Sequence, residues 1–310
     1  MVAALVAAGL IGACSSDSPK AADTSTAAVT TPTTNPTATT QAGTTTTAVA
    51  SHVSGDLTAE QLATELSTVE RAAAKGDAAV GQRQQLLYRY MSAHPDLDEA
   101  VIAGVTDDVR PYVERIVRAR QFGQARAATN PSPTPPSTTL PAWAVVDPLA
   151  ADELMGYYRE AESATGIPWY WLAAIHFQET RMGRIVGPSS AGAVGPMQFL
   201  PSTWAACCTG DPTITRDAIM GAAIYLVDGG GPADMNAALH HYNPNDGYVT
   251  TVTAFAENMR DTPQLYDAYR EWQVFYSTSA GTIRLPTGYA ESQPVDAATY
   301  LANHPDDATG

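Results

Sequence analysis

The chain has 310 residues, of which 45% are hydrophobic, 16% are charged and 8% are aromatic, and its formal net charge is −15. This length favours two domains, and the acidic balance argues against a nucleic-acid-binding protein, because neutralising phosphates requires a basic surface. Three cysteines cannot form a disulfide framework and match no zinc-binding spacing. We expect neither a metal nor a cofactor.

The first residues are typical of an export signal. Residues 1–13 are almost entirely small or apolar, in a run too short to cross a membrane, and they favour a signal peptide. Ile11-Gly12-Ala13-Cys14 resembles the bacterial lipobox, although no Lys or Arg precedes the apolar run. The resemblance implies lipidation at Cys14 and an exported lipoprotein in the cell envelope, held through its lipid on the outer face of the cytoplasmic membrane.

Residues 14–55 are rich in Thr, Ala and Pro. They cannot bury enough apolar area to offset the entropy of ordering, so we predict a disordered tether. Residues 129–141 have a similar Pro, Ser and Thr content and predict a second linker.

Between these two segments, residues 56–128 show helical periodicity. Thr58 and Gln61 have the spacing of a capping box, and the apolar residues that follow recur on one face, as in Leu62, Leu66 and Val69. We predict a helical hairpin or small bundle that serves packing or contacts an envelope protein partner.

Residues 142–275 contain the candidate chemistry. A first helix is predicted from about Pro148 to Ala164, and a second begins after Pro168. Glu179 follows Leu172 and Ile175 on one stripe of that second helix, where desolvation would favour the neutral form of a carboxyl group. A protonated carboxyl is what general-acid cleavage of a glycoside requires. The alternative is an exposed Glu179 that pairs with a nearby arginine, Arg181 or Arg184.

Two short motifs follow this helix in order. They are Gly195-Pro196-Met197-Gln198, which we expect to open a short helix after a glycine-rich loop, and Tyr242-Asn243. Together with Glu179 and Ser189, these motifs resemble the catalytic domain of the family 1 lytic transglycosylases, the soluble-lytic-transglycosylase or goose-lysozyme-like group. The resemblance covers about residues 148–260. Thr180 departs from the family's usual Ser.

The resemblance implies a catalytic domain that is dominated by α-helices, with an α+β lysozyme-like fold. It implies cleavage of the β-1,4 bond between N-acetylmuramic acid and N-acetylglucosamine in the glycan strands of peptidoglycan, with Glu179 acting first as acid and then as base. The released end would be a 1,6-anhydro sugar. The implied substrate-binding residues are Ser189, Met197, Gln198, Tyr242, Asn243 and Tyr248, and the hydroxyl of Tyr242 is a candidate to hold Glu179 or the substrate acetamido group.

Two other functions fit the same residues. A hydrolytic muramidase would use a second carboxylate, for which Asp211 and Asp217 are candidates, and a non-catalytic glycan-binding envelope lipoprotein would keep only the shape. Met197 is also compatible with simple core packing, and Tyr242 and Asn243 with a helix end.

Several remaining features favour structural roles. His176 is expected on the polar edge of its helix, and the adjacent Cys207 and Cys208 are expected to be loop residues or free thiols. A further helix is predicted to carry a packing stripe of aromatic residues that extends to Tyr276. Residues 276–310 predict an irregular C-terminal tail.

Overall fold

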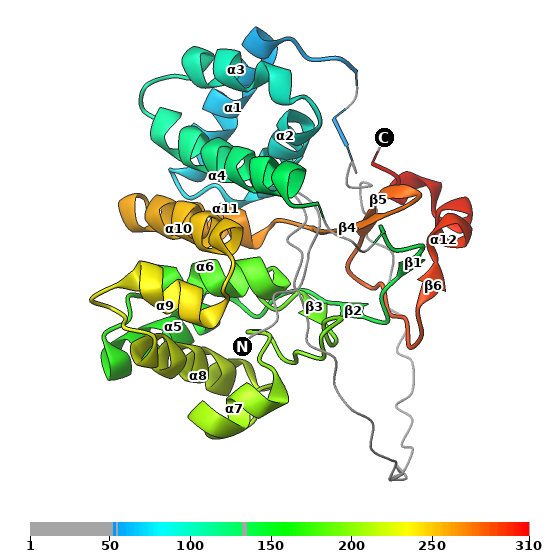
Figure 1. Ribbon diagram of the computed structural model, residues 1–310. Coiled ribbons are helices and arrows are strands. Elements are labelled where there is room, and N and C mark those ends of the chain that lie inside the picture. Colours follow the sequence, from blue (N-terminus) through cyan, green and yellow to red (C-terminus); the bar gives the residue numbers. More distant parts are fainter. Residues whose placement is uncertain (1–51, 54, 132–134, 310) are drawn as a thin grey trace, which may run out of the picture.

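The computed structural model describes residues 52–53, 55–131 and 135–309 (Figure 1). The predicted signal peptide, the lipidation site Cys14 and nearly all of the predicted tether lie outside the described residues.

The N-terminal block is a bundle of four α-helices with two short 3₁₀ turns. The capping box at the start of the first helix is confirmed, because the Thr58 and Gln61 side chains each accept a hydrogen bond from the other's backbone N–H. The elements are α1 (Ala59–Ala73), η1 (Ala78–Val80), α2 (Gly81–Ala93), η2 (Pro95–Leu97), α3 (Asp98–Gly104) and α4 (Arg110–Thr129).

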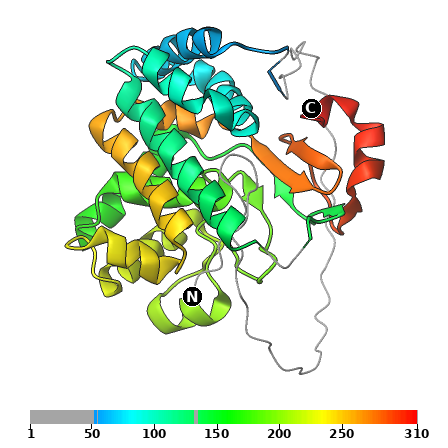
Figure 2. The same cartoon turned by 45° about the horizontal axis from the view of Figure 1, so that its top comes forward.

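The second block is also helical, which confirms the predicted helix-dominated fold class. Its helices are α5 (Ala151–Thr165), α6 (Trp169–Thr180), α7 (Pro201–Cys207), α8 (Thr215–Asp228), α9 (Met235–Tyr242), α10 (Asp246–Asp261) and α11 (Leu265–Arg270). Helix α10 packs against α4 on one side and α6 on the other (Figures 1 and 2). In the described part of the chain, no helix combines the length and the apolar character that crossing a membrane requires.

The two helical blocks share one hydrophobic core. Buried apolar side chains form a continuous cluster that extends from Leu62 in α1 to Trp272, beyond α11. Hydrogen bonds also join the blocks: Trp272 Nε1 donates to Gln84 Oε1 over 2.9 Å, and Gln85 exchanges hydrogen bonds with the backbone of Gln273. Residues 56–128 are therefore packed into the same body as the helices that carry the candidate site.

The prediction of an irregular tail over residues 276–310 is wrong. Strands β4 (Val274–Thr278) and β5 (Gly281–Leu285) form an antiparallel hairpin, so Tyr276 lies in a strand and the predicted aromatic helix ends earlier. The hairpin belongs to a second apolar core with residues from distant segments, including Leu140, Trp143 and Tyr300.

Non-local pairing explains why sequence periodicity missed part of this second core, since two of its strand pairs join short segments far apart in the chain, whereas β4 and β5 are neighbours in sequence. The last residues of the predicted 129–141 linker pair with a segment near the C-terminus, and these strands are two residues long. The pairs are β1 (Thr139–Leu140) with β6 (Val295–Asp296) and β2 (Ala144–Val145) with β3 (Ile185–Val186). Helix α12 (Ala297–Asn303) and η3 (Pro305–Asp307) complete the chain.

Candidate functional site

Glu179 lies in the last turn of α6 and is 1% exposed. Helix α6 is buried over nearly its whole length, because it lies between α5, α8 and α10 in the shared core. The predicted buried position of Glu179 is therefore confirmed. The neighbouring arginines are engaged elsewhere: Arg181 donates to the carbonyl of Phe177, and Arg184 lies within ion-pair distance of Asp147 and Glu271.

Tyr248 supplies a hydrogen bond to the carboxyl group of Glu179. Its hydroxyl donates to Glu179 Oε1 over 2.8 Å, and both side chains are buried. Burial, together with the nearby Glu179, raises the pKa of Tyr248 well above its usual value, so the phenol stays protonated and remains a donor. Tyr248 lies in the first turn of α10, where the side chain of Asn245 caps the helix by accepting from the Tyr248 N–H over 3.1 Å.

The Tyr242 hydroxyl contacts the backbone of the Gly195–Gln198 segment and not Glu179. Its hydroxyl donates to the carbonyl of Met197 over 2.7 Å, so it holds the Gly195–Gln198 segment. Its ring lies parallel to that of Tyr248, with 6.4 Å between the ring centres. Of the two roles expected for the Tyr242 hydroxyl, contact with Glu179 is therefore wrong. Tyr248 makes that contact, whereas Tyr242 contacts the loop.

Gly195–Gln198 is a turn rather than the start of a short helix, and α7 begins only at Pro201. Gln198 Nε2 donates to the carbonyls of Gly195 and Gly187, over 2.8 and 3.4 Å. Gln198 is 1% exposed, and no donor among the described residues reaches its Oε1. The described residues therefore leave this buried acceptor without a hydrogen bond.

The other predicted binding residues flank this turn. Ser189 is 7% exposed, and its hydroxyl accepts from the backbone N–H groups of Ala191 and Ala193, which shapes the loop before the turn. Met197 is fully buried, which agrees with core packing for its side chain. Asn243 is 7% exposed and ends α9.

Backbone strain is concentrated around this site. Among the described residues, the non-glycine residues with positive φ are Arg181 at 54°, Met182 at 57° and Gln198 at 51°. The first two follow Thr180, the residue next to Glu179, and the third carries the buried amide. Left-handed backbone costs free energy for such residues, and it persists where the surrounding structure enforces it, as at many functional sites.

Two residues that the sequence reasoning did not assign to the site contribute to it. Thr180 donates to the carbonyl of Pro196 over 2.7 Å and accepts from the N–H of Gly183 over 3.0 Å. Asn245 positions Tyr248 through the helix cap described above. The Asn245 role was visible in the sequence as an N-cap residue before a helix, whereas the contact of Thr180 with Pro196 joins segments that no local pattern connects.

His176 is fully buried, so its predicted place on a polar helix edge is wrong. Its Nδ1 lies 2.8 Å from the Tyr158 hydroxyl, and burial lowers the pKa of His176 to about 3. The imidazole is therefore neutral near pH 7. No group of three or more His, Cys, Asp or Glu side chains in the described segments is arranged to hold a metal ion.

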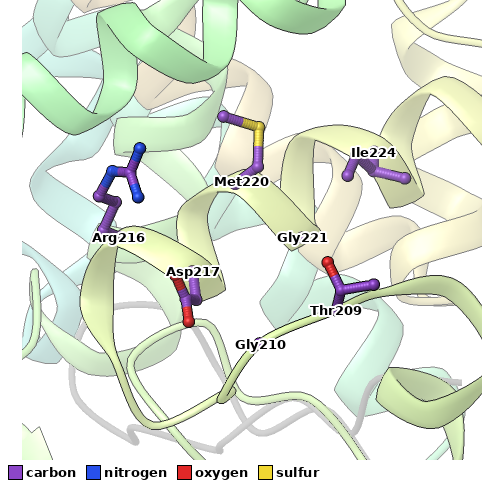
Figure 3. Close-up of a pocket in the computed structure, with 7 residues that line it drawn as sticks. All are labelled: Thr209, Gly210, Arg216, Asp217, Met220, Gly221 and Ile224. Atoms are coloured by element: carbon purple, nitrogen blue, oxygen red, sulfur yellow. The ribbon is translucent and has the colours of Figure 1, made fainter.

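Cys207 and Cys208 form a disulfide with each other, which corrects the expectation of free thiols. They end α7 beside a pocket between the 209–210 loop and α8, shown in Figure 3. In the pocket wall, Asp217 Oδ2 accepts from the N–H of Asp211, and Arg216 forms an ion pair with Glu160. The charged side chains of this pocket are thus engaged in contacts within the protein.

Comparison with known proteins gives one distant relationship. The chain is 26% identical over 151 residues to a membrane-bound lytic murein transglycosylase F from Thiobacillus denitrificans. The aligned region covers 46% of this chain and 32% of that protein. The chain therefore spans about a third of the length of the relative it matches. No protein-family model and no solved structure matches the chain.

Proposed function

We propose that this protein is a peptidoglycan lytic transglycosylase that cleaves the bond between N-acetylmuramic acid and N-acetylglucosamine and leaves 1,6-anhydro-N-acetylmuramic acid ends. The observation that carries the proposal is the buried Glu179 carboxyl, which accepts a hydrogen bond from Tyr248. The distant relationship to a lytic murein transglycosylase supports the same substrate class.

In the first step, Glu179 protonates the glycosidic oxygen as the bond to the anomeric carbon breaks. Tyr248 donates to Oε1, so the transferred proton belongs to Oε2, and the same hydrogen bond stabilises the carboxylate that remains. The substrate's N-acetyl oxygen would stabilise the positive charge at the anomeric carbon.

In the second step, the Glu179 carboxylate removes the proton from the C6 hydroxyl of the muramoyl sugar. The C6 oxygen then attacks the anomeric carbon and closes the anhydro ring, so no water is consumed and the proton returns to Glu179. An intramolecular nucleophile needs no second carboxylate to activate it, because the hydroxyl is already held near the reacting carbon.

The sequence candidates for a second carboxylate have structural partners instead. Asp211 accepts from the N–H and hydroxyl of Thr213, and Asp217 accepts from the N–H of Asp211. These contacts support a role in shaping the loop before α8, so we favour the anhydro reaction over hydrolysis.

We further propose that the enzyme works in the cell envelope as an exported lipoprotein attached through Cys14. The relative's description as membrane-bound supports an envelope location for that protein. An envelope protein partner for residues 56–128 stays a prediction. Replacing Cys14 with Ala should move the protein from the membrane fraction to the soluble envelope fraction.

The proposed function is tested by mass spectrometry of the sugars released from purified peptidoglycan. Anhydro ends are expected, whereas reducing ends would establish a muramidase. If no sugar is released but the protein still binds the glycan, it is a non-catalytic binding protein.

Tyr248→Phe should lower the cleavage rate by about 10- to 100-fold, because a hydrogen bond to a charged group contributes about 1.5–3 kcal/mol. The aromatic ring and its packing on Tyr242 remain. The control is Tyr289→Phe, which removes a hydroxyl that donates to the carbonyl of Pro141 over 2.6 Å in the second core. Initial rates of glycan cleavage should fall only for the first variant, and equal rates in both would show that the Tyr248 hydroxyl has no catalytic role.

A further inference from the structure

Three successive carbonyl groups in the Gly195–Gln198 turn each accept a hydrogen bond from a side chain. The carbonyl of Gly195 accepts from Gln198 Nε2 over 2.8 Å. The next carbonyl, of Pro196, accepts from the hydroxyl of Thr180, and the third, of Met197, accepts from the hydroxyl of Tyr242, both over 2.7 Å. The turn is therefore held from two helices, α6 and α9, as well as by its own glutamine.

Thr180 is the contact that joins this turn to the acid. It follows Glu179 in the chain and is fully buried. Its hydroxyl accepts from the N–H of Gly183, so its single hydrogen is directed to the carbonyl of Pro196. One side chain thus links the left-handed segment after Glu179 to the turn that carries Gln198.

The orientation of the Gln198 amide depends on this arrangement. Its backbone is held at a φ of 51°, and its Nε2 is used by the carbonyls of Gly195 and Gly187. These bonds fix Oε1 as the atom that is left to accept from a ligand. A turn that relaxes to an ordinary φ would rotate this acceptor away from its position.

We propose that Thr180 is a positioning residue for substrate: through the carbonyl of Pro196 it holds the Gly195–Gln198 turn so that Gln198 Oε1 accepts an N–H or O–H donor of the glycan. This inference rests on the proposed function. It assigns to Thr180 a role in glycan affinity rather than in proton transfer.

The test measures glycan binding in a Glu179→Gln background, which prevents turnover. The probe is a soluble tetrasaccharide of alternating N-acetylglucosamine and N-acetylmuramic acid, titrated by calorimetry. Adding Thr180→Val keeps the side-chain shape but removes the hydroxyl, and should weaken binding about 10-fold. Thr180→Ser restores the hydroxyl and should bind within about twofold of the background protein. If the valine variant does not fold, Thr180→Ala gives the same comparison.

Ser67→Ala is the matched control for a merely structural effect. The Ser67 hydroxyl is also buried, donates to the carbonyl of Ala63 over 2.7 Å and accepts from the N–H of Thr106 over 3.1 Å, but it lies in the N-terminal bundle. Ser67→Ala should leave the dissociation constant for the tetrasaccharide unchanged. Equal affinities of the Thr180→Val and Thr180→Ser proteins, or an equal loss in Ser67→Ala, would overturn the positioning role alone. Failure of the background protein to bind the tetrasaccharide would overturn the proposed function as well.

Discussion

Glu179→Gln is expected to lower the rate of peptidoglycan cleavage by about 10³-fold or more, since one proton-transfer group contributes about 10²–10⁴-fold and the proposed mechanism uses this residue in both steps. The amide has nearly the same shape as the carboxyl, and its oxygen can still accept from the Tyr248 hydroxyl. It cannot donate a proton to the glycosidic oxygen or take one from the C6 hydroxyl. The variant should therefore fold and bind glycan without cleaving it.

Release of soluble muropeptides measures the rate, and circular dichroism with thermal melting measures the fold. Glu153→Gln is a matched control, because Glu153 Oε1 also accepts from a tyrosine hydroxyl, that of Tyr157 over 2.7 Å, but at an exposed position of α5. The control should retain full activity. Cleavage by the Glu179 variant within tenfold of the wild-type rate would remove Glu179 from the mechanism.

Local periodicity was sufficient to predict the helix that carries the acid. The apolar residues Leu172 and Ile175 lie on the stripe that Glu179 completes, and the structure buries all three. The same reasoning identified the capping box of α1. Both features depend on residues within one or two helical turns, for which sequence spacing specifies the geometry.

The partners of the acid could not be predicted in the same way. Tyr242 and Tyr248 lie on consecutive helices, and which hydroxyl reaches Glu179 depends on how α9 and α10 pack against α6. The structure gives the contact with Glu179 to Tyr248 and the contact with Met197 to Tyr242. Strand β6 was missed for a related reason, because it pairs with β1, which is distant in the chain.

The shared core gives the N-terminal bundle a structural connection to the candidate site. The ring of Trp272 packs against the ring of Phe177, with 5.2 Å between the ring centres. Phe177 lies in α6, two residues before Glu179. On its other side, Trp272 donates to Gln84 of α2. Because Trp272 contacts both α2 and α6, the N-terminal bundle supports the helix that carries Glu179.

Gln84, which accepts from Trp272, also donates to a buried carboxyl group, that of Glu70. Glu70 of α1 is fully buried and accepts hydrogen bonds from the Tyr88 hydroxyl over 2.5 Å and from Gln84 Nε2 over 3.0 Å. Burial raises the pKa of Glu70 from 4.5 to about 7, and the two hydrogen bonds oppose that change. The folded protein thus binds this proton more tightly than the unfolded chain does.

The sign of the pH dependence follows from that difference. The stability that protonated Glu70 contributes is fully present below pH 4.5 and is lost as the pH rises through about 7, because the unfolded chain releases the proton first. A pKa difference between 4.5 and about 7 corresponds to about 3 kcal/mol in the free energy of unfolding. This residue therefore makes the protein less stable at pH 8 than at pH 5.

Glu70→Gln should remove this dependence, because the amide is neutral at every pH and can accept from Gln84 while it donates to Tyr88. Urea unfolding at pH 5 and pH 8 should show similar stability for the variant and the wild type at the lower pH. At pH 8 the variant should be more stable by up to about 3 kcal/mol. Glu60→Gln, an exposed change in the same helix, should keep the wild-type dependence. A variant at position 70 that loses stability at pH 8 would mean that an ionised Glu70 stabilises the contact between the bundle and α6, and the burial argument would then have the wrong sign.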